Sequence, residues 1–161
     1  MEGLEPVSEE SHEGFSKDLN AEYFFFFAPD CPVSINYTLF LREFSKNLSA
    51  DEKAYLIVPS PFYSKKEVVD FQEEYFLNIP SFLDPENELV KAFDASVTPE
   101  VVAVDSVGKV FYQGRIDDWI ESLGVKRRSA QNNYLLKAIE NYHSGKPVDP
   151  NYVEPVGCLI E

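Results

Sequence analysis

Two cysteines, Cys31 and Cys158, are the side chains of this sequence best suited to covalent chemistry. Four phenylalanines, an alanine and a Pro-Asp pair precede Cys31, and Pro32 follows it. A buried strand, a tight turn and a helix with Pro32 at its first position explain this pattern. Cys31 then lies at the helix N-terminus, where free N–H groups and the helix dipole lower the pKa of a thiol. We therefore expect Cys31 to be a partly exposed, reactive thiol.

The strand and the helix that would hold Cys31 are predicted from hydrophobic periodicity. Residues 24–27 form a continuous apolar run, which is typical of a strand buried on both faces of a sheet. Asp30 opposes the effect of the helix N-terminus on the pKa of the Cys31 thiol, because a neighbouring carboxylate disfavours a thiolate. After the turn, apolar side chains recur at helical spacing, at Tyr37, Phe40, Leu41, Phe44 and Leu48.

Further buried strands and helices alternate along the chain, which indicates an α/β fold with a parallel central sheet. Ser64 and Glu67 have the spacing of a capping box, so a helix is expected after Ser64. Asp84 is expected to cap another helix, with Pro85 in its first position. The other expected elements are strands at residues 54–58, 79–83, 100–104 and 110–113, an irregular segment at residues 119–128 and a helix at residues 132–142.

One folded domain with two extensions is expected from the 161 residues of the chain. Residues 1–14 are polar and acidic, and we predict a mobile arm there. Residues 15–146 form the domain, which the chain enters through a short helix or turn at residues 15–19. Residues 147–161 are an extended, proline-rich tail that carries Cys158.

The composition indicates a globular and acidic protein. Hydrophobic residues make up 44% of the chain, and 28 acidic against 14 basic residues give a net charge of −14. Such a surface repels phosphate backbones and anionic lipids, so neither nucleic acid nor a membrane surface is an expected partner. No apolar run is long enough to span a bilayer, and residues 1–20 lack the pattern of a signal peptide. The protein is then either cytoplasmic or a mature form without its signal, and we favour the extracytoplasmic alternative.

No cofactor and no metal are expected. The two histidines of the chain, His12 and His143, do not stand at zinc-ligand spacing from a cysteine. The two cysteines can form one disulfide, which is compatible with either compartment.

Residues 21–44 and 97–118 carry a resemblance to a known family. The first segment resembles the thioredoxin superfamily, in which the reactive cysteine lies between a central strand and its helix. The closer likeness is to the redoxin branch, which includes alkyl hydroperoxide reductases, thiol-specific antioxidant proteins and thiol-disulfide oxidoreductases. This resemblance covers residues 15–158 and implies a thioredoxin-like α/β fold, with a central mixed sheet flanked by helices.

The resemblance also implies roles for residues of the second segment. Thr98 and Pro99 stand at the place of the superfamily's cis-proline, so their peptide bond is expected to be cis and to face Cys31. Thr98 would then offer its backbone to an extended substrate, which makes Thr98 and Pro99 candidate substrate-binding residues. Arg115 would either stabilise the Cys31 thiolate or form an ion pair with one of the aspartates Asp117 and Asp118.

The sequence departs from several activities of the superfamily. A dithiol thioredoxin has a second cysteine where this chain has Ser34, and copper-delivering relatives have one where it has Ile35. The motif of a peroxiredoxin requires a hydroxyl residue and a proline at the positions of Ala28 and Phe24. The chain therefore has one cysteine in the motif and a second, distant one at Cys158.

Cys158 is the candidate resolving cysteine. It is the other cysteine of the chain, Ser34 occupies the usual resolving position, and apolar residues flank Cys158 in the tail. We therefore predict that a Cys31–Cys158 disulfide can form. The leading interpretation is a thiol-disulfide oxidoreductase that acts on protein or small-molecule thiols and disulfides, with Cys31 as nucleophile. Two alternatives remain: peroxide reduction through a sulfenic acid at Cys31, and a non-catalytic binding module in which the disulfide is structural.

Overall fold

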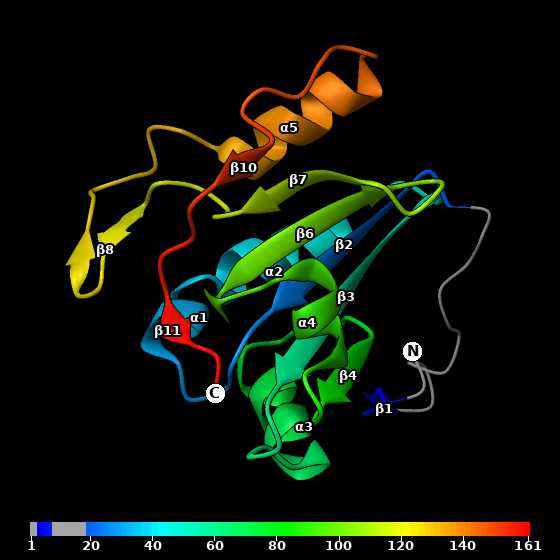
Figure 1. The fold of residues 1–161 in the computed structure, drawn as a ribbon. Helices are drawn as coiled ribbons and strands as arrows, with labels where there is room; N and C mark the ends of the chain where they lie inside the picture. The colour runs from blue at the N-terminus through cyan, green and yellow to red at the C-terminus, as the bar shows by residue number, and fades with distance from the viewer. Residues whose placement is uncertain (1–2, 8–18) are drawn as a thin grey trace.

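A seven-stranded mixed sheet forms the centre of the molecule, with the strand order β1-β4-β3-β2-β6-β7-β10 (Figure 1). The computed structural model describes residues 3–7 and 19–161 of the chain. The strands of this sheet are β1 (Glu5–Pro6), β2 (Ala21–Phe26), β3 (Glu52–Pro59), β4 (Ser81–Asp84), β6 (Glu100–Asp105), β7 (Val110–Gly114) and β10 (Tyr152–Val153). The middle strand β2 is parallel to β3 and antiparallel to β6, so the predicted mixed sheet is confirmed.

Strand β2 is buried on both faces, as its run of phenylalanines predicts. Phe25 and Phe27 belong to the larger apolar cluster, and Phe24 and Phe26 belong to the smaller cluster on the opposite face. Each of these four side chains is at most 4% exposed. The alternation follows from the pleat of a strand, in which successive side chains point to opposite faces.

Helices cover both faces of the sheet (Figure 1). They are α1 (Pro32–Asn36), α2 (Thr38–Lys46), α3 (Lys65–Glu74), α4 (Glu88–Phe93) and α5 (Tyr134–His143). Residues of α1, α2, α3 and α5 pack in the larger cluster, whereas α4 packs in the smaller one. The fold is therefore the expected α/β arrangement, with unequal helical layers.

The single helix predicted after Cys31 is divided into α1 and α2. Tyr37 separates them with φ −97° and ψ 7°, outside the helical values. Its hydroxyl donates a 2.6 Å hydrogen bond to Asp117 Oδ1, which holds the junction against the segment after β7. The helix is therefore interrupted at the residue that makes this buried tertiary contact, although periodicity alone indicates a continuous helix.

Two helix starts were predicted from capping residues, and one of them is correct. Ser64 caps α3 in a complete capping box with Glu67. Asp84 does not occupy the position directly before a helix, because α4 begins at Glu88 after an intervening turn. Its carboxylate nevertheless accepts hydrogen bonds from the N–H groups of the first three α4 residues, at 2.7, 3.0 and 3.3 Å. Asp84 therefore provides hydrogen-bond acceptors for the free N–H groups at the start of α4 without directly preceding the helix. Pro85 is a turn residue.

Two segments at the edges of the fold differ from expectation. The predicted irregular segment contains a small hairpin, formed by β8 (Ile120–Ser122) and β9 (Val125–Lys126). The predicted mobile arm contains β1, where Glu5 and Pro6 pair with β4, so this part of the arm is an edge strand. The rest of the predicted arm, and all but the last residue of the helix or turn expected at residues 15–19, lie outside the described residues.

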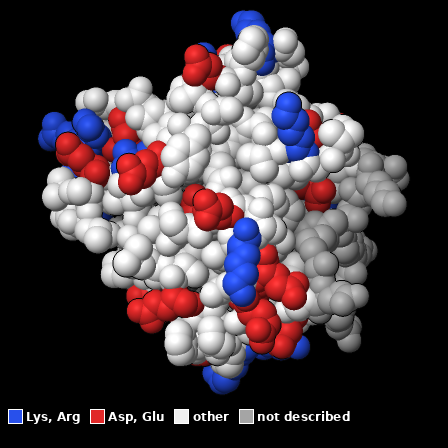
Figure 2. Space-filling view, in the orientation of Figure 1, with Lys and Arg blue, Asp and Glu red and all other residues white. Residues whose placement is uncertain are grey.

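The C-terminal tail returns to the domain at two places (Figure 1). Strand β10 pairs in parallel with β7, and β11 (Cys158–Leu159) pairs antiparallel with β5 (Val97–Thr98) in a separate two-stranded sheet. Figure 2 shows acidic and basic side chains interspersed over one face of the molecule. Within residues 3–7 and 19–161, no helix is sufficiently long and apolar to cross a membrane.

Candidate active site

The turn that carries Cys31 is held by two short-range hydrogen bonds. The Cys31 N–H donates to the Ala28 carbonyl at 3.0 Å and closes the turn between β2 and α1. The Ala28 N–H donates to Ser34 Oγ at 3.2 Å, and Ser34 is fully buried. Ser34, which stands where a dithiol thioredoxin has its second cysteine, therefore stabilises the turn through its hydroxyl. This role was not predicted from the sequence, because it depends on the path of the turn.

Cys31 and Cys158 form a disulfide, with their Cα atoms 6.2 Å apart. The predicted pairing is confirmed, although 127 residues separate the two cysteines in the chain. The prediction that Cys31 is partly exposed is wrong for this oxidised form, because its exposed fraction is 2%. The physical reason is the tail, since β11 lies along β5 and its Cys158 is bonded to the sulfur of Cys31.

The peptide bond between Thr98 and Pro99 is cis, as the family resemblance implies. The sulfur of Cys31 lies 3.3 Å from the Thr98 carbonyl oxygen, so this loop faces the cysteine turn. Thr98 also pairs with Cys158 in the β5–β11 ladder. The backbone that was expected to contact an external substrate is therefore occupied by the chain's own tail.

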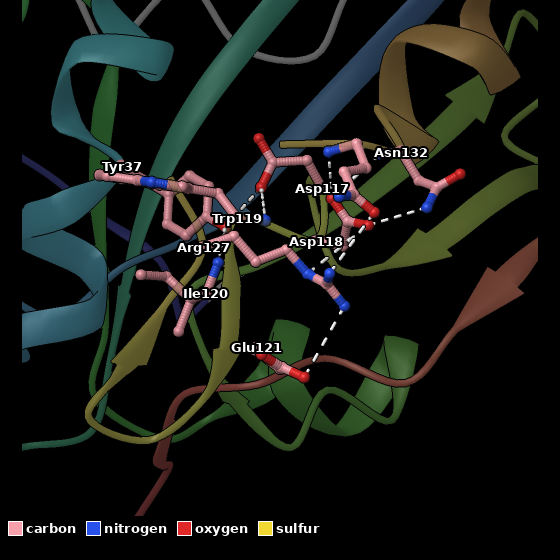
Figure 3. Close-up of polar contacts among 9 residues, drawn as sticks. Tyr37, Asp117, Asp118, Trp119, Ile120, Glu121, Arg127 and Asn132 are labelled. Atoms are coloured by element: carbon pink, nitrogen blue, oxygen red, sulfur yellow. Dashed lines mark hydrogen bonds and ion pairs between the residues drawn. The ribbon is translucent and has the colours of Figure 1, made fainter. Parts of the chain in front are cut away.

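Arg115 does not form the ion pair that was one of its two expected roles. Among the described residues, Asp118 pairs with Arg127 at 3.9 Å, and the Asp117 carboxylate accepts hydrogen bonds from Tyr37 and from the backbone N–H of Trp119 (Figure 3).

The second expected role of Arg115, stabilisation of the Cys31 thiolate, remains a prediction. Arg115 lines a small cavity together with Pro99 and Val156, and Cys31 is not among the residues that line it. The Arg115 Nε is buried and has no hydrogen-bond partner within the described part of the chain. Arg115 is therefore close to the cis-proline loop, and the tail residue Val156 lies at the same cavity.

A pocket of about 270 Å³ opens beside the disulfide. Its walls come from the cysteine turn, the end of β3, the Thr98 loop and the tail, and include Asp30, Phe62 and Tyr63. The Tyr63 hydroxyl donates a 2.5 Å hydrogen bond to Asp30 Oδ1. Burial, together with this hydrogen bond and the charge of Asp30, raises the pKa of Tyr63 above its ordinary value. Spacing in the sequence does not indicate that Tyr63 reaches Asp30, because the two residues belong to different βα units.

The chain belongs to the Redoxin family, whose model matches residues 16–125. No curated protein is significantly similar in sequence. The fold is similar to that of an uncharacterised conserved protein from Geobacillus kaustophilus, with 21% identity and a TM-score of 0.79 over 99% of this chain and 87% of that one.

Two further similar structures belong to proteins described by a redox activity. A thiol-disulfide isomerase from Corynebacterium glutamicum has 13% identity and a TM-score of 0.62, over 90% of this chain and 91% of that one. A secreted disulfide oxidoreductase from Mycobacterium tuberculosis has 15% identity and a TM-score of 0.50, over 56% of this chain and 66% of that one. At these identities the likenesses establish the thioredoxin-like fold.

Proposed function

We propose that this protein catalyses thiol–disulfide exchange, with Cys31 as the nucleophile and Cys158 as the resolving cysteine. The observation that carries the proposal is the disulfide between them, formed across 127 residues of chain against the Thr98–Pro99 loop. Membership of the Redoxin family supports a redox role for a cysteine at the turn after the first central strand. Thr98 and Pro99 are proposed to bind the substrate backbone.

The reduction of a substrate disulfide proceeds through two thiol–disulfide exchange steps, and neither step needs a cofactor. In the reduced protein, the Cys31 thiolate attacks one sulfur of a substrate disulfide, forms a mixed disulfide and expels the other sulfur as a thiolate. The Cys158 thiolate then attacks the Cys31 sulfur, forms the intramolecular disulfide and releases the second substrate thiolate. The substrate disulfide is thereby reduced, and the two cysteines of the protein are oxidised.

The return to the dithiol state starts from a structure in which the two cysteines differ in exposure. Cys31 is buried, Cys158 is half-buried, and both line the 270 Å³ pocket. We propose that an external thiolate enters this pocket and attacks the more exposed Cys158, so that Cys31 departs as a thiolate. A second thiolate from the reductant then frees Cys158.

Peroxide reduction would produce the same disulfide through a sulfenic acid at Cys31. The site lacks two groups that this chemistry requires in peroxiredoxins, because Ala28 and Phe24 supply neither a hydroxyl nor a proline. Both of these residues are buried within the fold. Thiol–disulfide exchange is therefore the function that the site supports better.

The proposal is tested with oxidised glutathione and full-length Cys158→Ser and Cys31→Ser variants. The Cys158→Ser variant should accumulate a glutathione adduct on Cys31, because the resolving thiol is missing. The wild-type protein should instead convert to the intramolecular disulfide, and Cys31→Ser should lose exchange activity by a factor of about 100 or more, as expected for loss of a nucleophile. Intact-protein mass spectrometry and peptide mapping identify each adduct.

Two results would overturn the proposal. Consumption of hydrogen peroxide faster than reduction of glutathione disulfide would identify a peroxidase. Resistance of the wild-type disulfide to dithiothreitol in the folded state would identify a structural cross-link in a non-catalytic binding module. In both cases the cysteines would pair as observed, so only the rates distinguish the functions.

We infer that the partners are protein or small-molecule thiols and disulfides and that the protein acts outside the cytoplasm. Disulfides persist in extracytoplasmic compartments, whereas cytoplasmic reductants keep most thiols reduced. The similar Mycobacterium tuberculosis oxidoreductase is described as secreted, which supports the same location.

A further inference from the structure

The tail residues that follow Gly157 run along the edge of β5 as an added strand. Cys158 pairs with Thr98, Leu159 pairs with Val97, and the Ile160 N–H donates a 3.1 Å hydrogen bond to the carbonyl of Ser96. Among the described strands, β11 is the only neighbour of β5 in its sheet. The edge of β5 therefore carries backbone groups for one extended peptide, and the tail uses them.

Gly157 occupies a position in which any side chain would collide with the protein. A Cβ atom built on Gly157 would lie 2.0 Å from the Thr98 carbonyl oxygen and 2.6 Å from the Thr98 carbonyl carbon. The obstacle is backbone rather than the end of a flexible side chain, so it cannot rotate away. A peptide bound in this register must have glycine immediately before its cysteine.

The two residues after Cys158 make different contacts. Leu159 is 79% exposed, so its side chain contributes little to the pairing. Ile160 packs against the smaller apolar cluster, which contains Phe24 and Phe26. One residue further on, the Asn87 side-chain amide donates a 3.2 Å hydrogen bond to the Glu161 carbonyl. The edge of β5 therefore selects an apolar residue at the second position after the cysteine and accepts many residues at the first.

We propose that residues 157–161 are a tethered pseudo-substrate, and that the edge of β5 binds extended peptides of the pattern Gly-Cys-x-aliphatic. The inference rests on the proposed function and adds the class of peptide that reaches Cys31. The tail shows the register, because its own disulfide with Cys31 has the connectivity of a mixed disulfide between Cys31 and a bound peptide. Such a peptide and the tail cannot occupy β5 together.

Because the tail and a peptide compete for β5, resolution of the mixed disulfide by Cys158 also releases the reduced peptide. The Cys31 thiolate attacks the cysteine sulfur of the bound peptide, whose former disulfide partner leaves as a thiolate. The displaced Cys158 remains a thiol until it attacks the Cys31 sulfur, forms the intramolecular disulfide and expels the peptide as a thiolate. The tail then pairs with β5 again, so the peptide loses its backbone contacts in the same step.

The test uses the full-length, reduced Cys158→Ser variant and an octapeptide with the sequence of residues 154–161. The peptide carries thionitrobenzoate on its cysteine, and the release of that group reports attack by Cys31. A peptide with alanine in place of the residue matching Gly157 should react at least about tenfold more slowly, because its methyl group would collide with the Thr98 carbonyl. A tenfold effect corresponds to a loss of only about 1.4 kcal/mol in binding free energy. Alanine in place of the residue matching Ile160 should slow the reaction several-fold. Alanine in place of the residue matching Leu159 is the matched control and should react at the parental rate.

A second measurement uses the tail itself, in full-length Gly157→Ala and Leu159→Ala variants. In a glutathione redox buffer, Gly157→Ala should shift the equilibrium away from the intramolecular disulfide, and Leu159→Ala should leave it unchanged. Equal rates for the glycine and alanine peptides would overturn the inference, while their attack by Cys31 would still uphold the proposed function. Failure of Cys31 to react with any of the peptides would overturn the inference, and failure to form the glutathione adduct as well would contradict the proposed function.

Discussion

At the scale of single residues, the Asp118 carboxylate, which follows β7, is surrounded by hydrogen-bond donors. Asp118 Oδ1 accepts hydrogen bonds from the N–H groups of Gln131 and Asn132 at 2.7 and 2.9 Å, and the Asn132 side chain donates to Oδ2 at 2.8 Å. These hydrogen bonds, those of Asn132 foremost, lower the pKa of Asp118 from 3.8 to about 2, with help from the charge of Arg127. Asp118 thereby holds the segment before α5 in place (Figure 3).

The lowered pKa of Asp118 predicts how stability depends on pH. Because the folded-state pKa lies below the unfolded value, the carboxylate stabilises the fold above about pH 4, and this contribution is lost as the pH falls toward 2. An Asp118→Asn variant should be less stable than wild type by about 1–3 kcal/mol at pH 7, because a charged hydrogen-bond acceptor is removed. Denaturant titrations between pH 7 and 2 should show the difference shrinking over the lower part of this range.

Glu121→Gln is the matched control for Asp118→Asn. Glu121 also contacts Arg127, at 3.8 Å, but its side chain is 55% exposed. The control should change stability by less than about 1 kcal/mol at every pH, as is usual for exposed ion pairs. A pH-independent loss in Asp118→Asn would contradict the assignment of the low pKa to this carboxylate.

At the scale of elements, β10 anchors the tail to the domain before β11 reaches Cys31. The Val153 carbonyl accepts a 3.0 Å hydrogen bond from the Arg115 N–H, and the Asn151 carbonyl accepts one of 3.0 Å from the Gln113 N–H. Gly114 pairs with Val153 and has φ +130°, a conformation that favours glycine. A Cβ atom at Gly114 would lie 1.8 Å from the Val153 carbonyl oxygen. The absence of a side chain at this position therefore permits the β7–β10 pairing.

We predict that Gly114→Ala detaches β10 from β7. The loss of stability should exceed the roughly 1–2 kcal/mol expected from an unfavourable backbone conformation alone, because a backbone contact is also broken. Hydrogen exchange at the amides of Gln113 and Arg115 should become faster, since both donate to the tail. Gly108→Ala is the matched control, because Gly108 has φ +82° but a Cβ atom there would meet no other atom within 4 Å. Equal effects of the two substitutions would show that the pairing does not depend on Gly114.

At the scale of the whole molecule, the disulfide joins the first βα unit to the end of the chain. It links Cys31, which follows the middle strand of the sheet, to a tail strand that begins 127 residues later. Both apolar clusters are built mainly from the sheet and its helices, and the tail contributes only partly buried side chains such as Val153 and Val156 to the larger one. The domain should therefore remain folded when the disulfide is reduced.

Reduction is nevertheless predicted to lower global stability. In the chain-entropy model, a cross-link across so long a loop stabilises the fold by about 4–5 kcal/mol, because it restricts the unfolded chain. Urea titrations of the oxidised protein and of the same protein in dithiothreitol should show this difference. A Cys31→Ser, Cys158→Ser double variant should match the reduced protein and should not respond to dithiothreitol. Equal stability of the oxidised and reduced proteins would contradict the prediction.

Local patterns in the amino-acid sequence were sufficient for the elements whose signals lie within a few residues. The phenylalanines at residues 24–27 indicated a strand buried on both faces, and the Ser64–Glu67 spacing indicated the start of α3, because periodicity and capping are short-range properties. The cysteine turn and the cis-proline were located through a family resemblance carried by equally short motifs. These features position Cys31 and Thr98, so the centre of the candidate site could be predicted.

Tertiary structure decided the features that depend on which distant segments meet. Two-residue strands such as β1 and β11 have no periodicity of their own and exist because a partner strand supplies their hydrogen bonds. The burial of Cys31 follows from one of these pairings, and the partner of Asp118 is Arg127 because the β8–β9 hairpin brings that arginine back to it. The sequence shows which residues could make such contacts but not which of them pair. Many alternative pairings have similar local energies, and only the folded chain selects among them.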